Sequence, residues 1–158
     1  MAHLISPSLL SANFCNLEND IKMLNDSQAD WLHVDVMDGV FVPNISFGQP
    51  VIKHIKKIAK KPLDVHLMIV EPDKFFEDYK NCGADIIRCG IGQGQMCLSR
   101  VVAGVGRPTI SMLQECSDAA HQIHGYVMND GGCSCPGDVC KALGCADFTM
   151  IGSLFAGA

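Results

Sequence analysis

The chain has 158 residues, a formal net charge of −5 and 18% charged residues. This length is enough for one domain with a sizeable core, and the acidic balance argues against nucleic acid or an anionic membrane as a partner. No apolar run reaches the roughly 18 residues of a membrane span, and the N-terminus lacks the basic flank and apolar core of a signal peptide. We therefore expect neither a membrane nor a nucleic acid among its partners.

Nine cysteines are many for this length, and the odd number leaves at least one without a partner in the chain. Cys82, Cys89 and Cys145 lie in apolar surroundings, where a free thiol behaves as a small buried hydrophobe. We expect most thiols to be free in a reducing, cytoplasmic compartment. Cys133 and Cys135 have no second pair at zinc-ribbon spacing, so we expect no structural zinc there.

The predicted elements alternate along the chain. Short apolar segments predict strands at 5–10, 30–36, 63–69, 85–89, 126–129 and 147–151. Helical spacing or start signals occur between them at 17–24, from Pro50 to about 59, from 71 to about 82, at 109–123 and at 136–143. Pro50 suits the first position of its helix. This alternation predicts a single α/β domain over 1–158, with a parallel sheet and right-handed crossovers.

About six strands are fewer than the eight of a (βα)8 barrel, which usually needs about 250 residues. No predicted helix follows the last strand. We expect a barrel that is either truncated or completed by a partner chain. Because an open parallel edge exposes backbone and apolar surface, we also expect a homo-oligomer.

Polar side chains interrupt two of the apolar strands. His33, Asp35 and Met37 share one face of the second predicted strand, and His66 and Met68 share one face of the third. Burying such groups is costly without a reason, and two histidines with a carboxylate suit a divalent metal such as zinc, manganese or iron. The alternative is that neighbouring carboxylates simply satisfy the two histidines. A metal could polarise a carbonyl while a carboxylate removes the neighbouring proton.

Three motifs carry a resemblance: Ser6-Pro7-Ser8-Leu9-Leu10-Ser11-Ala12, His33-Val34-Asp35-Val36-Met37-Asp38-Gly39-Val40-Phe41-Val42-Pro43-Asn44 and Asp64-Val65-His66-Leu67-Met68. Over residues 4–87 the sequence resembles the ribulose-phosphate 3-epimerases, barrels that interconvert ribulose 5-phosphate and xylulose 5-phosphate through an enediolate. The resemblance implies that His33, Asp35 and His66 bind the metal and that Asp35 is one acid/base. It also implies that Ser8 contacts substrate, with Met37 and Met68 lining the site.

The segment Gly83-Ala84-Asp85-Ile86-Ile87 is a seam, because the resemblance changes there. A glycine-rich loop follows it: Gly90-Ile91-Gly92-Gln93-Gly94-Gln95-Met96-Cys97. Such loops approach ligands or ions with backbone groups. Cys97 is a nucleophile only if its thiolate is stabilised, and otherwise an ordinary thiol.

Residues 83–157 resemble the C-terminal part of GMP reductase and its relative IMP dehydrogenase. The matching stretches are 90–100, 104–106, 115–121, 130–139 and 150–157. The resemblance implies that Cys97 attacks purine C2 and that Gly92, Gly94 and Cys97 lie on a monovalent-cation loop. It further implies that Asp130 holds the ribose hydroxyls, while phosphate is bound by Gly132, Gly152 and Ser153.

Several positions depart from the reductase pattern. Gln93 and Gln95 replace a usual Pro and Ser, and Ser99 stands where a catalytic Thr is usual. The later segment of that family, with a catalytic Glu, and its N-terminal half have no counterpart here. We therefore expect no reductase chemistry and no NADPH.

The two halves also have a shared feature. In the epimerases, an Asp-Gly-Gly supplies a metal ligand that is the second acid/base, and a later Gly-Ser binds phosphate. Asp130-Gly131-Gly132 and Gly152-Ser153 stand at comparable places, and glycines let backbone N–H groups approach phosphate. The sequence is thus compatible with a metal site of His33, Asp35, His66 and Asp130. The alternative is that Asp130-Gly131-Gly132 is simply a tight turn that ends a strand.

Three functions remain open. The leading hypothesis is a metal-dependent sugar-phosphate epimerase site, intact or vestigial, in which Asp35 and Asp130 exchange a proton on opposite faces. The second is purine nucleotide binding through the C-terminal half, with Cys97 reactive. The third is a non-catalytic chimeric barrel. The first two take a phosphorylated small molecule as ligand.

Overall fold

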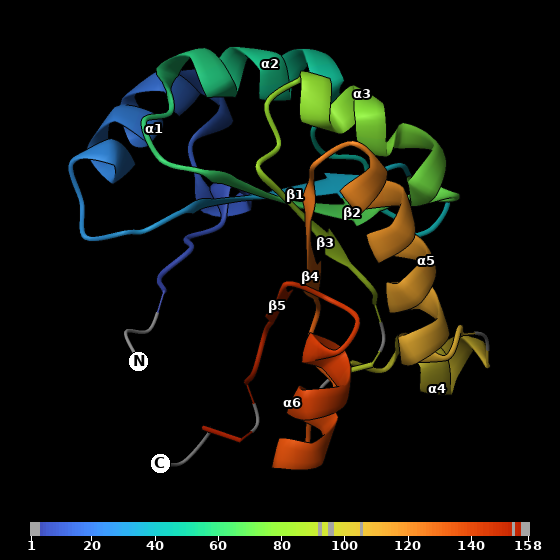
Figure 1. Cartoon of the computed structure of the whole chain (residues 1–158). Helices are drawn as coiled ribbons and strands as arrows, with labels where there is room; N and C mark the ends of the chain where they lie inside the picture. The colour runs from blue at the N-terminus through green and yellow to red at the C-terminus, as the bar shows by residue number, and fades with distance from the viewer. Residues whose placement is uncertain (1–3, 92, 95–96, 105, 153, 156–158) are drawn as a thin grey trace. The chain divides into compact units, whose positions relative to one another are not determined.

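The computed structural model describes residues 4–91, 93–94, 97–104, 106–152 and 154–155 (Figure 1). The chain forms two compact units, Met1–Ile87 and Arg88–Ala158. The division falls at the end of the seam that the sequence marked at residues 83–87. No helix in the described part is long and apolar enough to cross a membrane.

The first unit contains two long parallel strands with helices between and after them. Its elements are η1 (Leu9–Ser11), η2 (Phe14–Asn16), α1 (Leu17–Asn25), β1 (Leu32–Met37), α2 (Gln49–Ile58), β2 (Leu63–Met68), η3 (Pro72–Phe75) and α3 (Phe76–Asn81). β1 and β2 pair in parallel from Leu32 opposite Leu63 to Met37 opposite Met68. Both strands are almost wholly buried, as expected where helices cover a parallel sheet.

The helix α2 shows how the sequence pattern produces the packing. Pro50 lies in its first turn, where a missing N–H costs nothing. Ile52 and Ile55 are buried, whereas Lys53 and Lys57 are exposed on the outer side. α2 packs against α1, and both helices end where the prediction placed them to within one or two residues.

The first predicted strand, 5–10, forms only one parallel bridge, between Ser8 and His33. The carbonyl of Pro7 accepts a hydrogen bond from the His33 N–H at 2.9 Å, but Pro7 has no N–H to continue a ladder. The chain then turns into η1, which the Ser8 hydroxyl caps by accepting from the Leu10 N–H. This is why the described residues contain five strands rather than about six.

The second unit holds shorter elements: α4 (Ser99–Ala103), α5 (Thr109–Gln122), β4 (Tyr126–Asn129), α6 (Pro136–Leu143) and β5 (Phe148–Thr149). β3 (Ile86–Cys89) crosses the boundary between the units. β4 and β5 pair in parallel through Met128 opposite Phe148 and Asn129 opposite Thr149. α5 and α6 were predicted, whereas α4 was not. The observed class is α/β, built from βα units.

Asp138 stabilises the start of α6. Its Oδ2 accepts hydrogen bonds from the Ser134 hydroxyl at 2.8 Å and the Ser134 N–H at 3.1 Å, and these bonds lower the pKa of Asp138 to about 2. A folded-state pKa below the ordinary 3.8 means that the stabilisation is complete above that value and disappears as the pH falls through about 2.

We therefore expect amide exchange in residues 136–143 to accelerate between about pH 4 and pH 2, beyond the intrinsic pH dependence of exchange. In Asp138→Asn this extra acceleration should be absent, because no carboxylate is left to protonate. The same profile in both proteins would contradict this role of Asp138.

Candidate metal centre

The candidate centre lies on one face of the β1–β2 pair. Alternation along each strand sends every second side chain to that face. The parallel register then pairs the side chains of this face across the two strands: His33 lies opposite Asp64, Asp35 opposite His66, and Met37 opposite Met68. The sequence had placed five of these six side chains at the site, and only Asp64 had no assigned role.

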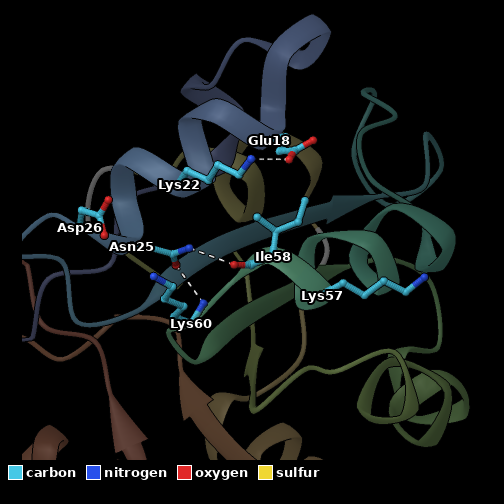
Figure 2. A pocket seen from close by; sticks show the side chains of 7 residues that line it. All are labelled: Glu18, Lys22, Asn25, Asp26, Lys57, Ile58 and Lys60. Atoms are coloured by element: carbon cyan, nitrogen blue, oxygen red, sulfur yellow. Dashed lines mark hydrogen bonds and ion pairs between the residues drawn. The ribbon is translucent and has the colours of Figure 1, made fainter.

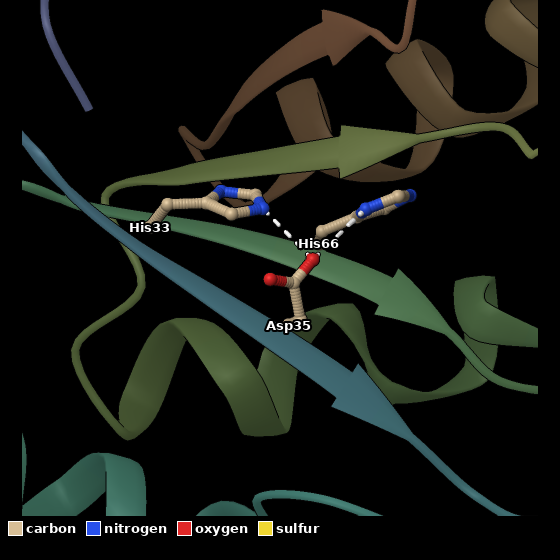
Figure 3. Close-up of side chains that lie close together, drawn as sticks. All are labelled: His33, Asp35 and His66. Atoms are coloured by element: carbon tan, nitrogen blue, oxygen red, sulfur yellow. Dashed lines mark hydrogen bonds and ion pairs between the residues drawn. The ribbon is translucent and has the colours of Figure 1, made fainter. Parts of the chain in front are cut away.

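Asp35 lies between the two histidine rings, as Figure 3 shows. Its Oδ1 is 2.8 Å from His33 Nε2 and 3.5 Å from His66 Nδ1. All three side chains are buried, and each offers one ligand atom within 4.8 Å of the others. The structure therefore brings together three of the four predicted metal ligands.

The surroundings of Asp35 keep it ionised. Burial would raise the pKa of this carboxyl, but hydrogen bonds from His33 and His66, the charge of His33 and a hydrogen bond from Ser8 outweigh burial and hold the pKa well below its usual range. The Ser8 hydroxyl donates to Asp35 Oδ2 at 2.7 Å. Ser8 thus contacts the site through Asp35, while its contact with substrate stays a prediction.

Ser46 holds the backbone at the end of β1. Its hydroxyl donates to the Asp35 carbonyl at 2.5 Å and accepts from the Met37 N–H at 3.0 Å. The loop that follows β1 is closed by an antiparallel bridge between Asp38 and Ile45. Contacts from the adjacent residues Ile45 and Ser46 therefore hold the end of β1 and the start of the loop that follows it.

Asp64 is the residue that sequence reasoning missed. It is fully buried on β2, and its Oδ2 lies 2.9 Å from His33 Nδ1 and 3.4 Å from the Ser6 hydroxyl. The signal was present, because Asp64 is two residues before His66 and so shares its face. What the sequence lacked was the register that places Asp64 beside His33.

The donor set fits a divalent metal. Two imidazoles and one carboxylate are the ligands that zinc, manganese and iron accept, and a histidine that also contacts a carboxylate is a common arrangement in such sites. Two ligands bound at about 2.1 Å from one ion lie at most about 4.2 Å apart. The donor atoms, all within 4.8 Å of one another, would need only small shifts to bind one ion.

The predicted residues of the second unit are placed less completely. Asp130 Oδ1 lies 3.4 Å from the Arg88 guanidinium, and its role as a fourth ligand stays a prediction. Gly131 and Gly132 both have φ near +76°, which glycine adopts readily. A Cβ on Gly132 would meet Gln93 at 2.9 Å, so Gln93 packs against the glycine predicted to bind phosphate.

The remaining predictions concern the glycine-rich loop and the end of the chain. Cys97 is partly exposed, and its N–H donates to the Gly94 carbonyl at 3.0 Å. A Cβ on Gly152 would meet open space. Gly92 and Ser153 lie outside the described residues. Nucleotide, phosphate and monovalent-cation binding by these residues stay predictions.

A surface hollow of about 500 Å³ lies beside α1 and α2 (Figure 2). Asn25 closes part of it by donating to the Ile58 carbonyl at 2.9 Å and accepting from the Lys60 N–H at 2.9 Å. Lys22 pairs with Glu18 across one turn of α1. No residue of the His33–Asp35–His66 group lines this hollow, so we assign it no part in the metal centre.

Comparison with known proteins connects both halves with described families. A curated ribulose-phosphate 3-epimerase of Synechocystis sp. is 55% identical over 83 residues, which are 52% of this chain and 36% of that protein. GMP reductase 2 of Mus musculus is 38% identical over 150 residues, or 93% of this chain and 40% of that protein. The reductase similarity thus extends well beyond residues 83–157.

A solved structure shows the same type of fold. The crystal structure of inosine 5′ monophosphate dehydrogenase from Legionella pneumophila matches 98% of this chain and 44% of its own, with a TM-score of 0.70 and 28% identity. The chain therefore spans between 36% and 44% of the lengths of these three proteins. Its parallel βα units are of the (βα)8-barrel type, as predicted.

The sequence model of the ribulose-phosphate 3 epimerase family matches residues 4–105, which is 102 of the 158 residues. The match includes the whole of the His33–Asp35–His66 group and continues past the seam. The chain belongs to the ribulose-phosphate 3-epimerase family.

Proposed function

We propose that the chain forms a metal-dependent sugar-phosphate 3-epimerase site that interconverts ribulose 5-phosphate and xylulose 5-phosphate. The observation that carries this proposal is the buried His33–Asp35–His66 group within the segment matched by the family. Two imidazoles and a carboxylate converging on one face of two paired parallel strands are suited to hold a cation beside a bound carbonyl compound.

The chemistry requires moving a proton at a carbon next to a carbonyl. A bound divalent metal would polarise that carbonyl and stabilise the developing negative charge. Asp35 stays ionised, so it is able to accept the proton, and Ser8 and His33 orient its two oxygens. Asp130 would serve the opposite face of the same carbon and complete the ligand set.

The remaining groups would bind and enclose the sugar phosphate. Met37 and Met68 face each other across β1 and β2 and would form an apolar wall. Backbone N–H groups at Gly132, Gly152 and Ser153 would hold the phosphate. We also propose a reducing, cytoplasmic location, in which the free thiols of the described residues would stay reduced. We further propose self-association to cover exposed sheet edges.

The test combines metal content with turnover. The full chain is freed of metal by chelation and titrated with Zn²⁺, Mn²⁺ and Fe²⁺, and the conversion of ribulose 5-phosphate is followed in each case. We expect one metal per site and turnover that depends on it. Absence of bound metal together with absence of turnover would refute the proposal.

A second candidate function rests on the 38% identity to GMP reductase 2 over 93% of the chain. In this alternative the second unit binds a purine nucleotide beside Cys97. Thiol labelling followed by mass spectrometry tests it, because bound GMP or IMP should protect Cys97 but not the exposed Cys15 or Cys140. Equal labelling with and without nucleotide would exclude this function, and failure of both tests would leave a non-catalytic barrel.

A further inference from the structure

Asp64 is a charged side chain with no exposed surface, on the strand that carries His66. An ionised carboxylate is costly to bury unless neighbouring groups compensate it. Here one carboxylate oxygen faces both His33 Nδ1 at 2.9 Å and the Ser6 hydroxyl at 3.4 Å. The contact with His33 is the shorter, and the parallel register places the two residues directly opposite.

We infer that Asp64 is a positioning residue that turns His33 so that Nε2 faces the metal. The inference rests on the proposed metal-dependent function. A carboxylate can only accept a hydrogen bond, so its contact requires a proton on Nδ1 of His33. Nε2 is then the nitrogen that faces Asp35 Oδ1, 2.8 Å away, and it would give up its proton to bind a metal.

This arrangement also explains how the His33 imidazole can keep one nitrogen directed at an ion. A ring held at one nitrogen cannot rotate freely, so its other nitrogen keeps a fixed direction. A carboxylate at the far side of a metal-binding histidine further raises the basicity of the ligand nitrogen. Without Asp64, His33 would be able to turn and present either nitrogen, and the cost of orienting it would reduce the affinity for metal.

The experiment compares zinc affinity in the full-length protein and three variants, by competition with a chromophoric chelator. Asp64→Leu removes the acceptor, and Asp64→Asn keeps an acceptor oxygen but removes the charge. Ser6→Ala is the matched control, because it deletes the other, longer hydrogen bond to the same oxygen. We expect Asp64→Leu to weaken zinc binding about 10- to 100-fold, Asp64→Asn to fall between, and Ser6→Ala to change it less than about threefold.

A second readout reports on His33 itself. Long-range ¹H–¹⁵N spectra of the zinc-loaded protein should show a proton on Nδ1 and the metal on Nε2. In Asp64→Leu the Nδ1 proton should lose its protection from exchange with solvent. A merely structural role for Asp64 would alter the unfolding temperature but not this spectroscopic signature.

Each outcome decides between the inference and the function on which it rests. Equal zinc affinity in the wild type and Asp64→Leu would overturn the inference and leave the metal centre standing. If Asp64→Leu does not fold, Asp64→Asn decides, since an affinity no lower than that of Ser6→Ala also overturns it. A wild-type protein that binds no zinc would refute the metal centre, and the inference with it.

Discussion

Asp35→Asn is expected to reduce turnover sharply and to weaken metal binding strongly. Asp35 lies within reach of both imidazoles through one oxygen and accepts from Ser8 through the other. Asparagine has nearly the same shape but lacks the charge that attracts the cation and the basicity that accepts a proton. Loss of the proton acceptor alone should reduce the rate by about 10²- to 10⁴-fold. Loss of a direct ligand should weaken metal binding by more than the roughly 10- to 100-fold typical of outer-shell partners.

The matched control is Asp85→Asn, measured by the same turnover and zinc titrations. Asp85 is also an aspartate of the first unit in contact with strand backbone, since its Oδ2 accepts from the Leu63 N–H and from Lys56. It lies next to the start of β2, whereas the candidate centre includes His66 farther along that strand. The Asp85→Asn variant should therefore bind zinc with the affinity of the wild type. If Asp35→Asn bound zinc as tightly as Asp85→Asn, the assigned centre would be wrong.

The His33–Asp35–His66 group could be predicted because it depends on the alternation of side chains along each strand. A period of two on each of two strands is enough to place His33 with Asp35 and His66 with Met68 on single faces. The convergence of the two polar faces was inferred from the architecture of a barrel, whose interior such faces line. Asp64 could not be assigned in the same way, because pairing it with His33 requires the register of β1 against β2.

Other differences between prediction and structure also have local causes. The first predicted strand, 5–10, forms only one bridge because Pro7 has no N–H to continue the ladder, and the prediction did not take this missing N–H into account. α4 was not predicted, since it has five residues and no side-chain cap at Leu98. Its one clear signal is Gly104, which ends the helix with φ of +65°.

The seam at residues 83–87 concerns how the chain divides into units. Sequence similarity changes there, and the compact units divide at Ile87, yet the family match continues to residue 105. A division in contacts does not by itself decide whether the units unfold separately. β3 bears directly on this question, because its four buried residues, Ile86 to Cys89, include two from each unit.

Leu113→Ala is expected to destabilise the whole chain, including the unit that does not contain it. Leu113 is fully buried on α5 of the second unit, and truncating a buried leucine costs about 2–5 kcal/mol. We expect β3 to couple the two units, because its four buried residues are shared between them. We therefore predict one unfolding transition, shared by both units.

The measurement uses Trp31, the chain's single tryptophan, as a reporter of the first unit while far-UV circular dichroism follows both units. In urea, Leu113→Ala should shift the Trp31 transition and the dichroism transition by the same amount. Ile110→Ala, on the same helix but 37% exposed, should shift both much less. If only part of the dichroism change shifted to lower urea while the Trp31 transition kept its wild-type midpoint, the two units would unfold independently. A single shared transition would instead show that the two units fold as one cooperative domain.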